Sequence, residues 1–455
     1  MLRVILYGTR DYAASSGNDF PRSAFAHGST LPEVSAVAWS SFMTGKNPAE
    51  HGIFGFMELD KSSYEFIFPN FLSLKAPTFW EKLGMATVAC NIPQTYPARP
   101  LNGVLISGFV ALDLAKAVYP KKVYDYLTGM NYQLDVKSQL AAKNPEEFFK
   151  NLFFVFEKRM EAITYLYDQE EWQIFIGTIT ETDRLHHFFF DSARSGQYHH
   201  IFTNFYRKLD EFLWKLFLRS QRDQALFLTC SDHGFTPIVS EVYVNRYLQD
   251  CGHLNLADGG SLKNITAPTE AFALDPARIY IHLKNKYQRG FVETSEYEGL
   301  RQKLKSLFNS LTFNGKRVVK RVFFKEEIFA GPYLEDAPDL YILGEPGFDM
   351  KATLNKETIF GRSHFRGAHT HGDAHLFISD RDRLSPGINI DINRVPHLVL
   401  SYFSECQKMG IAHRFPSGPI RINWLTVCEI LAVCQPVSTD LSGFDQRPIE
   451  DGVIV

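Results

Sequence analysis

The stretch "LFLTCSDHGF" (residues 226–235) joins an apolar run to an acid, an imidazole and a glycine. The run over residues 225–230 is short and apolar, which is typical of a buried β-strand. Asp232 and His233 follow it almost directly. In a parallel α/β sheet, ligands bind beyond the carboxyl ends of the strands. The stretch therefore indicates a functional site, although an isolated Asp-His pair is more often part of a turn or a helix cap.

Similar apolar runs recur along the chain and alternate with longer helical patterns. Strands are expected at residues 3–8, 86–92, 103–109, 172–179, 225–230 and 339–344. Helices are expected at residues 145–167 and 199–220, where apolar side chains recur every three or four positions. This alternation predicts an α/β fold with a mostly parallel central sheet.

The alternation is interrupted between residues 241 and 345, which contain an amphipathic helix near 294–311. We interpret this segment as a smaller inserted cap subdomain. Residues 1–240 and 346–455 would then form the catalytic core.

Composition excludes some classes of protein. The net charge of −3 gives no sequence-independent affinity for nucleic acid. The six cysteines form no C-x-x-C pair, which favours buried thiols in a reducing compartment. The longest apolar runs are too short to span a bilayer, and the N-terminus makes a poor signal peptide. We therefore expect a cytoplasmic protein.

A second acid–imidazole cluster follows the strand expected at 172–179. Asp183 and His187 are four residues apart, so on a helix they would share one face and could bind one cation. The alternative is an N-cap aspartate beside an ordinary histidine.

A third cluster contains His369, His371 and His375 within seven residues, in a segment expected to be a loop before an apolar strand. The alternative is a solvated loop. Taken together, the clusters supply oxygen and nitrogen ligands without thiolate, which suits zinc or manganese. Two clusters of acid and histidine suggest two ions, about 4 Å apart if they serve phosphoryl transfer.

Ser35 is a candidate nucleophile because it opens an expected helix, where a phosphate oxygen would also be stabilised. The alternative is an N-cap serine.

Four segments in order carry a resemblance to a known family. They are "VSAVAWSSFMTGKNPAEHGIFGF" (34–56), "TETDRLHHFF" (180–189), "LTCSDHGF" (228–235) and "GAHTHGDAHLF" (367–377). The set resembles the alkaline phosphatase superfamily, in particular its type I phosphodiesterase/nucleotide pyrophosphatase branch. The resemblance extends from about residue 28 to the C-terminus. It implies an alkaline-phosphatase-like three-layer sandwich and a metal-dependent phosphohydrolase acting on a small phosphate ester or phosphodiester.

The resemblance also implies roles for individual residues. Ser35 corresponds to the family's nucleophile, which would form a phosphoserine intermediate. The implied ligands of the first ion are Asp183, His187 and His369, and those of the second are Asp232 and His233. His371 and His375 are then neighbours of the site rather than ligands.

Two departures from the family pattern matter. The family has an Asp-Gly pair after its first strand, about forty residues before the nucleophile, and that aspartate completes the second ion site. Here Asp11 is the best replacement and Asp19 a weaker one. Phe56 stands where nucleotide pyrophosphatases have a phosphate-binding asparagine, so nucleotide specificity is not transferred. Trp39 and Phe56 could instead line an apolar substrate pocket, together with the run 188–190.

Two alternatives to hydrolysis stay open. The same phosphoserine could pass to another hydroxyl, as in a phosphotransferase or phosphomutase. A shortened N-terminal segment could also leave an inactive relative that binds a phosphorylated ligand.

Overall fold

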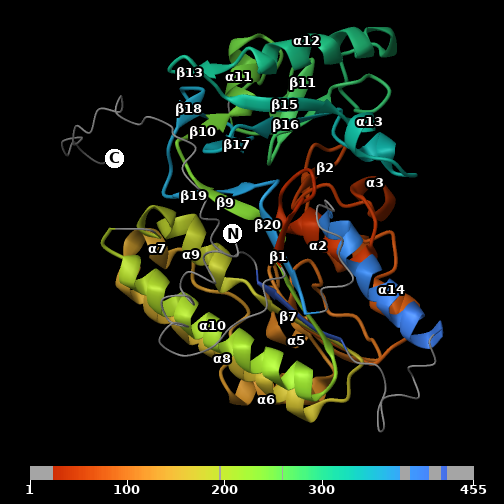
Figure 1. Cartoon of the computed structure of the whole chain (residues 1–455). Coiled ribbons are helices and arrows are strands. Elements are labelled where there is room, and N and C mark those ends of the chain that lie inside the picture. The colour runs from red at the N-terminus through yellow and green to blue at the C-terminus, as the bar shows by residue number, and fades with distance from the viewer. Residues whose placement is uncertain (1–23, 194–195, 259, 380–389, 409–421, 428–455) are drawn as a thin grey trace.

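The computed structural model, which describes residues 24–193, 196–258, 260–379, 390–408 and 422–427, has two packed regions (Figure 1). The lower region is built on an eight-stranded sheet and the upper region on a four-stranded sheet. Separate clusters of buried apolar side chains lie beside the two sheets. None of the helices in the described ranges combines the length and apolar character that a bilayer crossing requires.

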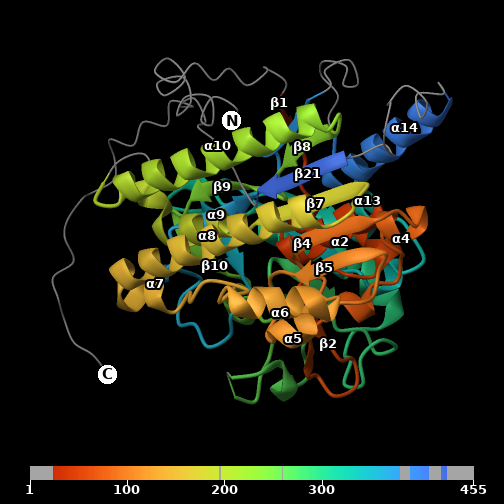
Figure 2. The same cartoon turned by 90° about the horizontal axis from the view of Figure 1, so that it is seen from below.

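The main sheet confirms a mostly parallel α/β fold. Its order is β1 (Ala24–His27), β20 (Ala374–Ile378), β8 (Leu226–Cys230), β21 (Ile422–Val427), β7 (Ile174–Ile179), β4 (Thr87–Ile92), β5 (Gly103–Ser107) and β6 (Val118–Tyr119). The five strands from β8 to β5 are parallel to one another, and Figure 2 shows them side by side. β20 and β6 pair antiparallel with the edges of this parallel block. The expected strands at 86–92, 103–109, 172–179 and 225–230 are therefore confirmed.

The centre of the sheet contains a strand that the sequence did not lead us to expect. β21 pairs parallel with both β7 and β8, from Ile422 opposite Ile174 and Leu226 onward. It thus lies between the two strands that lead into the Asp183 and Asp232 clusters. The first strand expected from the sequence, at 3–8, lies outside the described residues.

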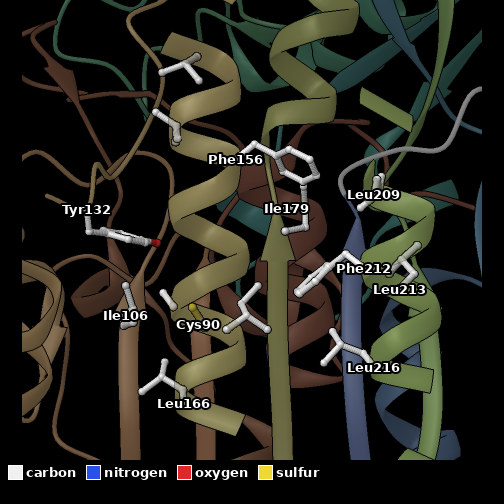
Figure 3. Packing of buried hydrophobic residues seen from close by; sticks show 14 of the residues in the cluster. Cys90, Ile106, Tyr132, Phe156, Leu166, Ile179, Leu209, Phe212, Leu213 and Leu216 are labelled. Atoms are coloured by element: carbon white, nitrogen blue, oxygen red, sulfur yellow. The ribbon is translucent and has the colours of Figure 1, made fainter. Parts of the chain in front are cut away.

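Helices cover both faces of the main sheet. On one face, α8 (Pro145–Gln169) and α10 (His199–Arg222) confirm the two long helical patterns, and their apolar stripes pack against the strands. Figure 3 shows α8 residue Phe156 and α10 residue Phe212 directed toward Ile179 of β7. On the other face pack α2 (Ser35–Thr44), α4 (Phe79–Leu83) and α14 (Val395–Lys408).

The upper region contains an antiparallel sheet, in the order β11 (Ala271–Leu274), β12 (Arg278–Ile281), β16 (Leu340–Gly344) and β15 (Val319–Phe324). The strand expected at 339–344 is β16 (Leu340–Gly344), and it pairs with β12 and β15 in this sheet. The expected helix near 294–311 is α12. The boundaries at 241 and 345 stay a prediction.

The remaining elements are shorter. Those before residue 240 are α3 (Pro48–His51), β2 (Glu58–Leu59), β3 (Phe66–Ile67), α5 (Leu114–Ala117), α6 (Lys121–Gly129), α7 (Leu140–Lys143), α9 (Glu181–Phe189) and β9 (Gly234–Pro237). Those from residue 240 onward are β10 (Ser240–Tyr243), α11 (Val244–Asp250), β11 (Ala271–Leu274), β12 (Arg278–Ile281), α12 (Tyr297–Asn309), β13 (Thr312–Phe313), β14 (Lys316–Arg317), β15 (Val319–Phe324), α13 (Lys325–Ile328), β16 (Leu340–Gly344), β17 (Phe348–Lys351), β18 (Phe360–Gly361) and β19 (Gly367–Thr370). Short 3-10 turns also occur, and one of them, Ile392–Arg394, directly precedes α14. Cys90 and Cys230 are buried and Cys251 is exposed, and none of these three forms a disulfide bond with another described residue.

Asp210 of α10 gives a test of the fold that is independent of the functional site. Burial, followed by the charge of Glu211, raises its pKa from 3.8 to about 7. Because the pKa is higher in the folded than in the unfolded state, this carboxyl destabilises the protein increasingly as the pH rises from about 4 to 7. We expect Asp210→Asn to raise Tm by roughly 2 °C or more at pH 8 and by less at pH 5, measured by scanning calorimetry. Equal shifts at both pH values would contradict this account.

Candidate functional site

Ser35 is the first residue of α2, but it is not a helix cap. The N-cap position is Val34, whose carbonyl accepts hydrogen bonds from the N–H groups of Val37 and Ala38. The Ser35 hydroxyl instead lies 3.3 Å from Nε2 of His233, and the residue is only 8% exposed. The alternative interpretation of the sequence, in which Ser35 is an N-cap serine, is therefore wrong.

Asp183 and His187 lie on one face of α9. The helix begins at Glu181 with Thr180 as its N-cap, so Asp183 is a helical residue rather than a cap. Oδ1 of Asp183 lies 3.3 Å from Nε2 of His187. Oδ2 accepts a hydrogen bond from Arg184 at 2.8 Å. The two oxygens of Asp183 therefore face different partners.

His369 lies in strand β19 and not in a loop. β19 pairs antiparallel with β9, which places His369 opposite Phe235, two residues after His233. Nδ1 of His369 lies 2.8 Å from the carbonyl oxygen of Glu33, and Nε2 lies 3.4 Å from Oδ1 of Asp183. The loop expectation failed because a four-residue strand that contains a glycine, a histidine and a threonine has too little apolar alternation to be distinguished from a loop.

Hydrogen bonds to backbone carbonyls fix which nitrogen of each imidazole carries hydrogen. Nδ1 of His187 must donate to the carbonyl of Gly367 at 3.1 Å, and Nδ1 of His369 must donate to Glu33. In their neutral forms, both imidazoles therefore direct the lone pair of Nε2 inward. These two atoms are 3.0 Å apart, and both face Oδ1 of Asp183. Three acceptors that converge in this way repel one another unless a proton or a cation lies between them.

The charge balance of the site favours a cation. Burial alone would raise the pKa of Asp183, but His187, His369 and Arg184 hold it well below the usual range, so the carboxylate is ionised. Burial lowers the pKa of His187, against the opposing charge of Asp183. Burial also opposes protonation of His369, but Asp183 outweighs it and raises that pKa. A single positive charge at this position is thus stabilised by the surrounding groups.

Asp232 and His233 lie directly beyond β8 and are fully buried. Oδ2 of Asp232 is 3.3 Å from Nε2 of His233, and neither carboxylate oxygen has a hydrogen-bond partner among the described residues. Burial raises the pKa of Asp232 to about 6, although the Ser35 hydroxyl lowers it in part. A buried carboxylate without hydrogen bonds is costly unless a cation compensates it.

Asp183, His233 and His369 offer one ligand atom each, all within 4.8 Å of one another. The rings of His233 and His369 are stacked with centroids 3.5 Å apart, which brings His233 into the Asp183 group. Oxygen and imidazole nitrogen at these separations suit a divalent cation. The donor set therefore fits a metal ion.

Gly234 is required for close packing rather than for a turn. A Cβ atom at this position would lie 2.1 Å from Oδ1 of Asp373 and 2.6 Å from Oγ1 of Thr370. A residue without a side chain lets β19, and therefore His369, approach β9.

The other two histidines of the third cluster, His371 and His375, lie in different parts of the structure. His375 lies in β20, where it is buried and its Nε2 is 2.8 Å from the hydroxyl of Thr229. His371 lies just after β19 and lines a cavity near the site. Asp11 and Asp19 lie outside the described residues, so the structure does not place the carboxylate expected for the second ion.

The residues expected to line an apolar pocket separate into two groups. Trp39 is fully buried and packs edge-on against Phe42, so it is part of the core and not of the cavity wall. Phe188 and Phe189 are buried in the cluster beneath α8. Phe56 does line the cavity and meets Phe109 at 5.4 Å between ring centroids.

A cavity of about 610 Å³ lies between the two regions. His187 and His369 line it from the lower region, and Tyr341, Phe348 and Lys351 line it from the upper region. The hydroxyl of Tyr341 donates a hydrogen bond to the Glu33 carboxylate, and the Glu33 carbonyl orients His369. The upper region is therefore in direct contact with a residue that orients the site.

Solved structures show which class of fold this is. Phosphonoacetate hydrolase from Sinorhizobium meliloti 1021, in complex with phosphonoformate, has a TM-score of 0.55 at 15% identity, over 86% of this chain and 90% of that chain. A mutant of the alkaline phosphatase PafA has a TM-score of 0.51 at 13% identity, over 86% and 91%. Murine ectonucleotide pyrophosphatase/phosphodiesterase 5 follows with 0.45 at 12% identity, over 88% of each chain. The first two similarities show that the chain has an α/β fold similar to that of alkaline-phosphatase-like enzymes.

The sequence identifies the family. Residues 22–373 match the family model of type I phosphodiesterase/nucleotide pyrophosphatase, and the chain belongs to this family. It is accordingly a phosphoric ester hydrolase of a family that generally depends on divalent metals. No curated protein sequence matches the chain.

Proposed function

We propose that this enzyme hydrolyses phosphodiesters or phosphate esters with Ser35 as its nucleophile and two divalent cations, zinc or manganese. The observation that carries the proposal is the position of the Ser35 hydroxyl. It lies 3.3 Å from Nε2 of His233, which in turn belongs to the buried group with Asp183 and His369. A hydroxyl without a capping role thus lies beside a site that fits a metal.

The ligand assignment in this proposal follows the two acid–imidazole groups. Asp183, His187 and His369 would hold one ion, and Asp232 and His233 the other. The inward lone pairs at Asp183 support the first site, and the unpartnered oxygens of Asp232 support the second. When bound, such ions lower the pKa of the serine hydroxyl and neutralise charge on the phosphoryl oxygens.

The remaining groups would bind and orient the substrate. The N-terminus of the ten-residue helix α2 favours an anion next to Ser35. Oγ of Ser35 would attack phosphorus and form a new P–O bond, while the bond to the leaving oxygen breaks and an alcohol departs. Water then hydrolyses the seryl phosphoester and regenerates Ser35.

The cavity wall supports a small substrate with an apolar leaving group. Phe56, Phe348, Phe365 and Tyr341 are aromatic residues that line the cavity. Phe56 has no hydrogen-bonding group for a phosphate oxygen. The wall would therefore favour substrates whose apolar surface contacts these aromatic rings. Phosphonoformate is a ligand of the phosphonoacetate hydrolase, and here too we propose a small phosphorus-containing molecule.

Metal removal tests this proposal. We expect protein stripped by a chelator to lose roughly 100-fold or more of its turnover of bis-p-nitrophenyl phosphate, and to regain it with zinc or manganese. The reason is that the charge on the transferred phosphoryl group is then no longer neutralised. The control is the same chelator saturated with zinc beforehand. Full activity of protein shown to be metal-free by elemental analysis would contradict the proposal. So would inactivity of the metal-loaded protein toward both the diester and p-nitrophenyl phosphate.

A further inference from the structure

Arg184 lies between two carboxylates, only one of which belongs to the candidate metal site. Its Nη1 donates to Oδ2 of Asp183 at 2.8 Å. Its Nε and Nη2 donate to the carboxylate of Asp135, the shortest of these bonds being 2.7 Å from Nη2 to Oδ2. The guanidinium also lies 4.2 Å from the ring centroid of Phe109, and the side chain is only 11% exposed. Arg184 is therefore held by a bidentate ion pair and by an aromatic face.

This contact determines which oxygen of Asp183 is available. Oδ2 is occupied by Arg184, whereas Oδ1 has no hydrogen-bond partner among the described residues and faces His187 and His369. A carboxylate held in this way presents one oxygen to a cation rather than two. The rotamer of Asp183 is fixed at the same time, because swinging the carboxylate would break the bond to Arg184.

The anchor of Arg184 is itself fixed from the opposite side. Asp135 belongs to a short segment, residues 132–135, whose Leu134 carbonyl accepts a hydrogen bond from Nη2 of Arg159 at 3.1 Å. Arg159 is fully buried and forms an ion pair with Glu181 at 2.8 Å. Glu181 begins α9, two residues before Asp183. Two arginines thus connect the same segment to the same helical turn.

From this arrangement we propose that Arg184 is a positioning residue that makes Asp183 a one-oxygen ligand and so sets the affinity of the site for its cation. The inference rests on the proposed function, because it requires a cation at Asp183. Nothing in the sequence pattern singled out Arg184, which acts through Asp183 and does not reach the reacting atoms.

The test compares cation binding by the full chain with that of Arg184→Gln. Competition with a chromophoric zinc chelator gives the affinity, and the visible absorption of the cobalt-loaded protein reports the ligand geometry. We expect zinc to bind roughly 10- to 100-fold more weakly in the variant, since the loss of an outer partner of a metal ligand has effects of this size. We also expect a changed cobalt spectrum, which a general loss of stability would not produce. Unchanged affinity and an unchanged spectrum in a folded Arg184→Gln protein would overturn the inference.

Two further variants complete the design. Asp135→Asn keeps the guanidinium but removes its charged anchor, so we expect a smaller loss of affinity in the same direction. If Arg184→Gln does not fold, Asp135→Asn is used in its place. A zinc affinity equal to that of wild type in Asp135→Asn would then overturn the inference. Arg219→Gln is the matched control, because Arg219 forms an ion pair with Asp168 on the surface of the helical layer, at 3.1 Å, and should bind zinc as wild type does.

The same measurements separate this inference from the proposed function. If the wild-type protein binds neither zinc nor manganese, or if Asp183→Asn binds the cation as tightly as wild type, the proposed function fails. If Asp183→Asn loses zinc while Arg184→Gln keeps wild-type affinity and spectrum, the site stands and only the role of Arg184 is wrong.

Discussion

Replacement of Ser35 by alanine should lower kcat for bis-p-nitrophenyl phosphate by roughly 1,000-fold or more in metal-loaded protein. The Ser35→Ala protein has no hydroxyl to form the seryl phosphoester, and only water can attack phosphorus. The fold should not change, since the hydroxyl caps no helix and its neighbours His233 and Asp232 both belong to the candidate site. Steady-state kinetics at saturating substrate measure the effect.

Ser40 supplies the matched control on the same helix. It is fully buried, and its hydroxyl donates to the carbonyl of Ala36, one turn earlier in α2. Ser40→Ala therefore removes a hydroxyl from α2 without touching the site, and kcat should stay within about twofold of wild type. Comparable losses in both variants would show that the effect of Ser35→Ala comes from α2 and not from a nucleophile.

The second large effect is expected for Asp183→Asn. The change keeps the size of the side chain but removes the negative charge that faces Nε2 of His187 and of His369. We expect zinc affinity to fall on the order of 1,000-fold, more than the 10- to 100-fold that is typical for an outer partner of a ligand. Chelator competition followed by elemental analysis of the dialysed protein measures the loss.

Asp349→Asn is the control for this variant. Asp349 lines the same cavity, but its carboxylate pairs with Lys351 at 2.7 Å, on the wall formed by the upper region. Its removal should leave zinc affinity unchanged. If the two aspartates had equal effects on zinc binding, the cation would not be held at Asp183.

The sequence predicted the parallel strands well, because β4, β5, β7 and β8 are apolar runs with clear boundaries. It also predicted the strand at 339–344, although an apolar run carries no information about the strands with which it pairs. β21 was missed for a related reason. The segment "INWLTV" (422–427) has the polar residue Asn423 and little contrast with its surroundings, so its place at the centre of the sheet follows from tertiary pairing.

The residues of the candidate site were predictable because four segments in order resemble those of a known family, whereas each acid–imidazole pair alone could have been part of a turn or a helix cap. Ser35, Asp183, Asp232 and His369 come from distant parts of the chain, and the structure brings them together. What the sequence could not show is the set of contacts that orients them. These contacts include the backbone carbonyl of Glu33 and the side chain of Arg184. Neither could be recognised in the sequence, because every residue has a backbone carbonyl and arginines are common.

The position of β21 has a consequence for how this protein can be made. β7 and β8 each use one edge to pair with β21, the last described strand of the chain. A nascent chain that has emerged only to residue 379 carries Ser35, Asp183, Asp232 and His369, yet both of these edges are unpaired. Exposed strand edges recruit other chains, and domains usually fold from the N-terminal side during synthesis. The main sheet cannot be completed in this N-terminal-first order, because its centre forms only after residues 422–427 have left the ribosome.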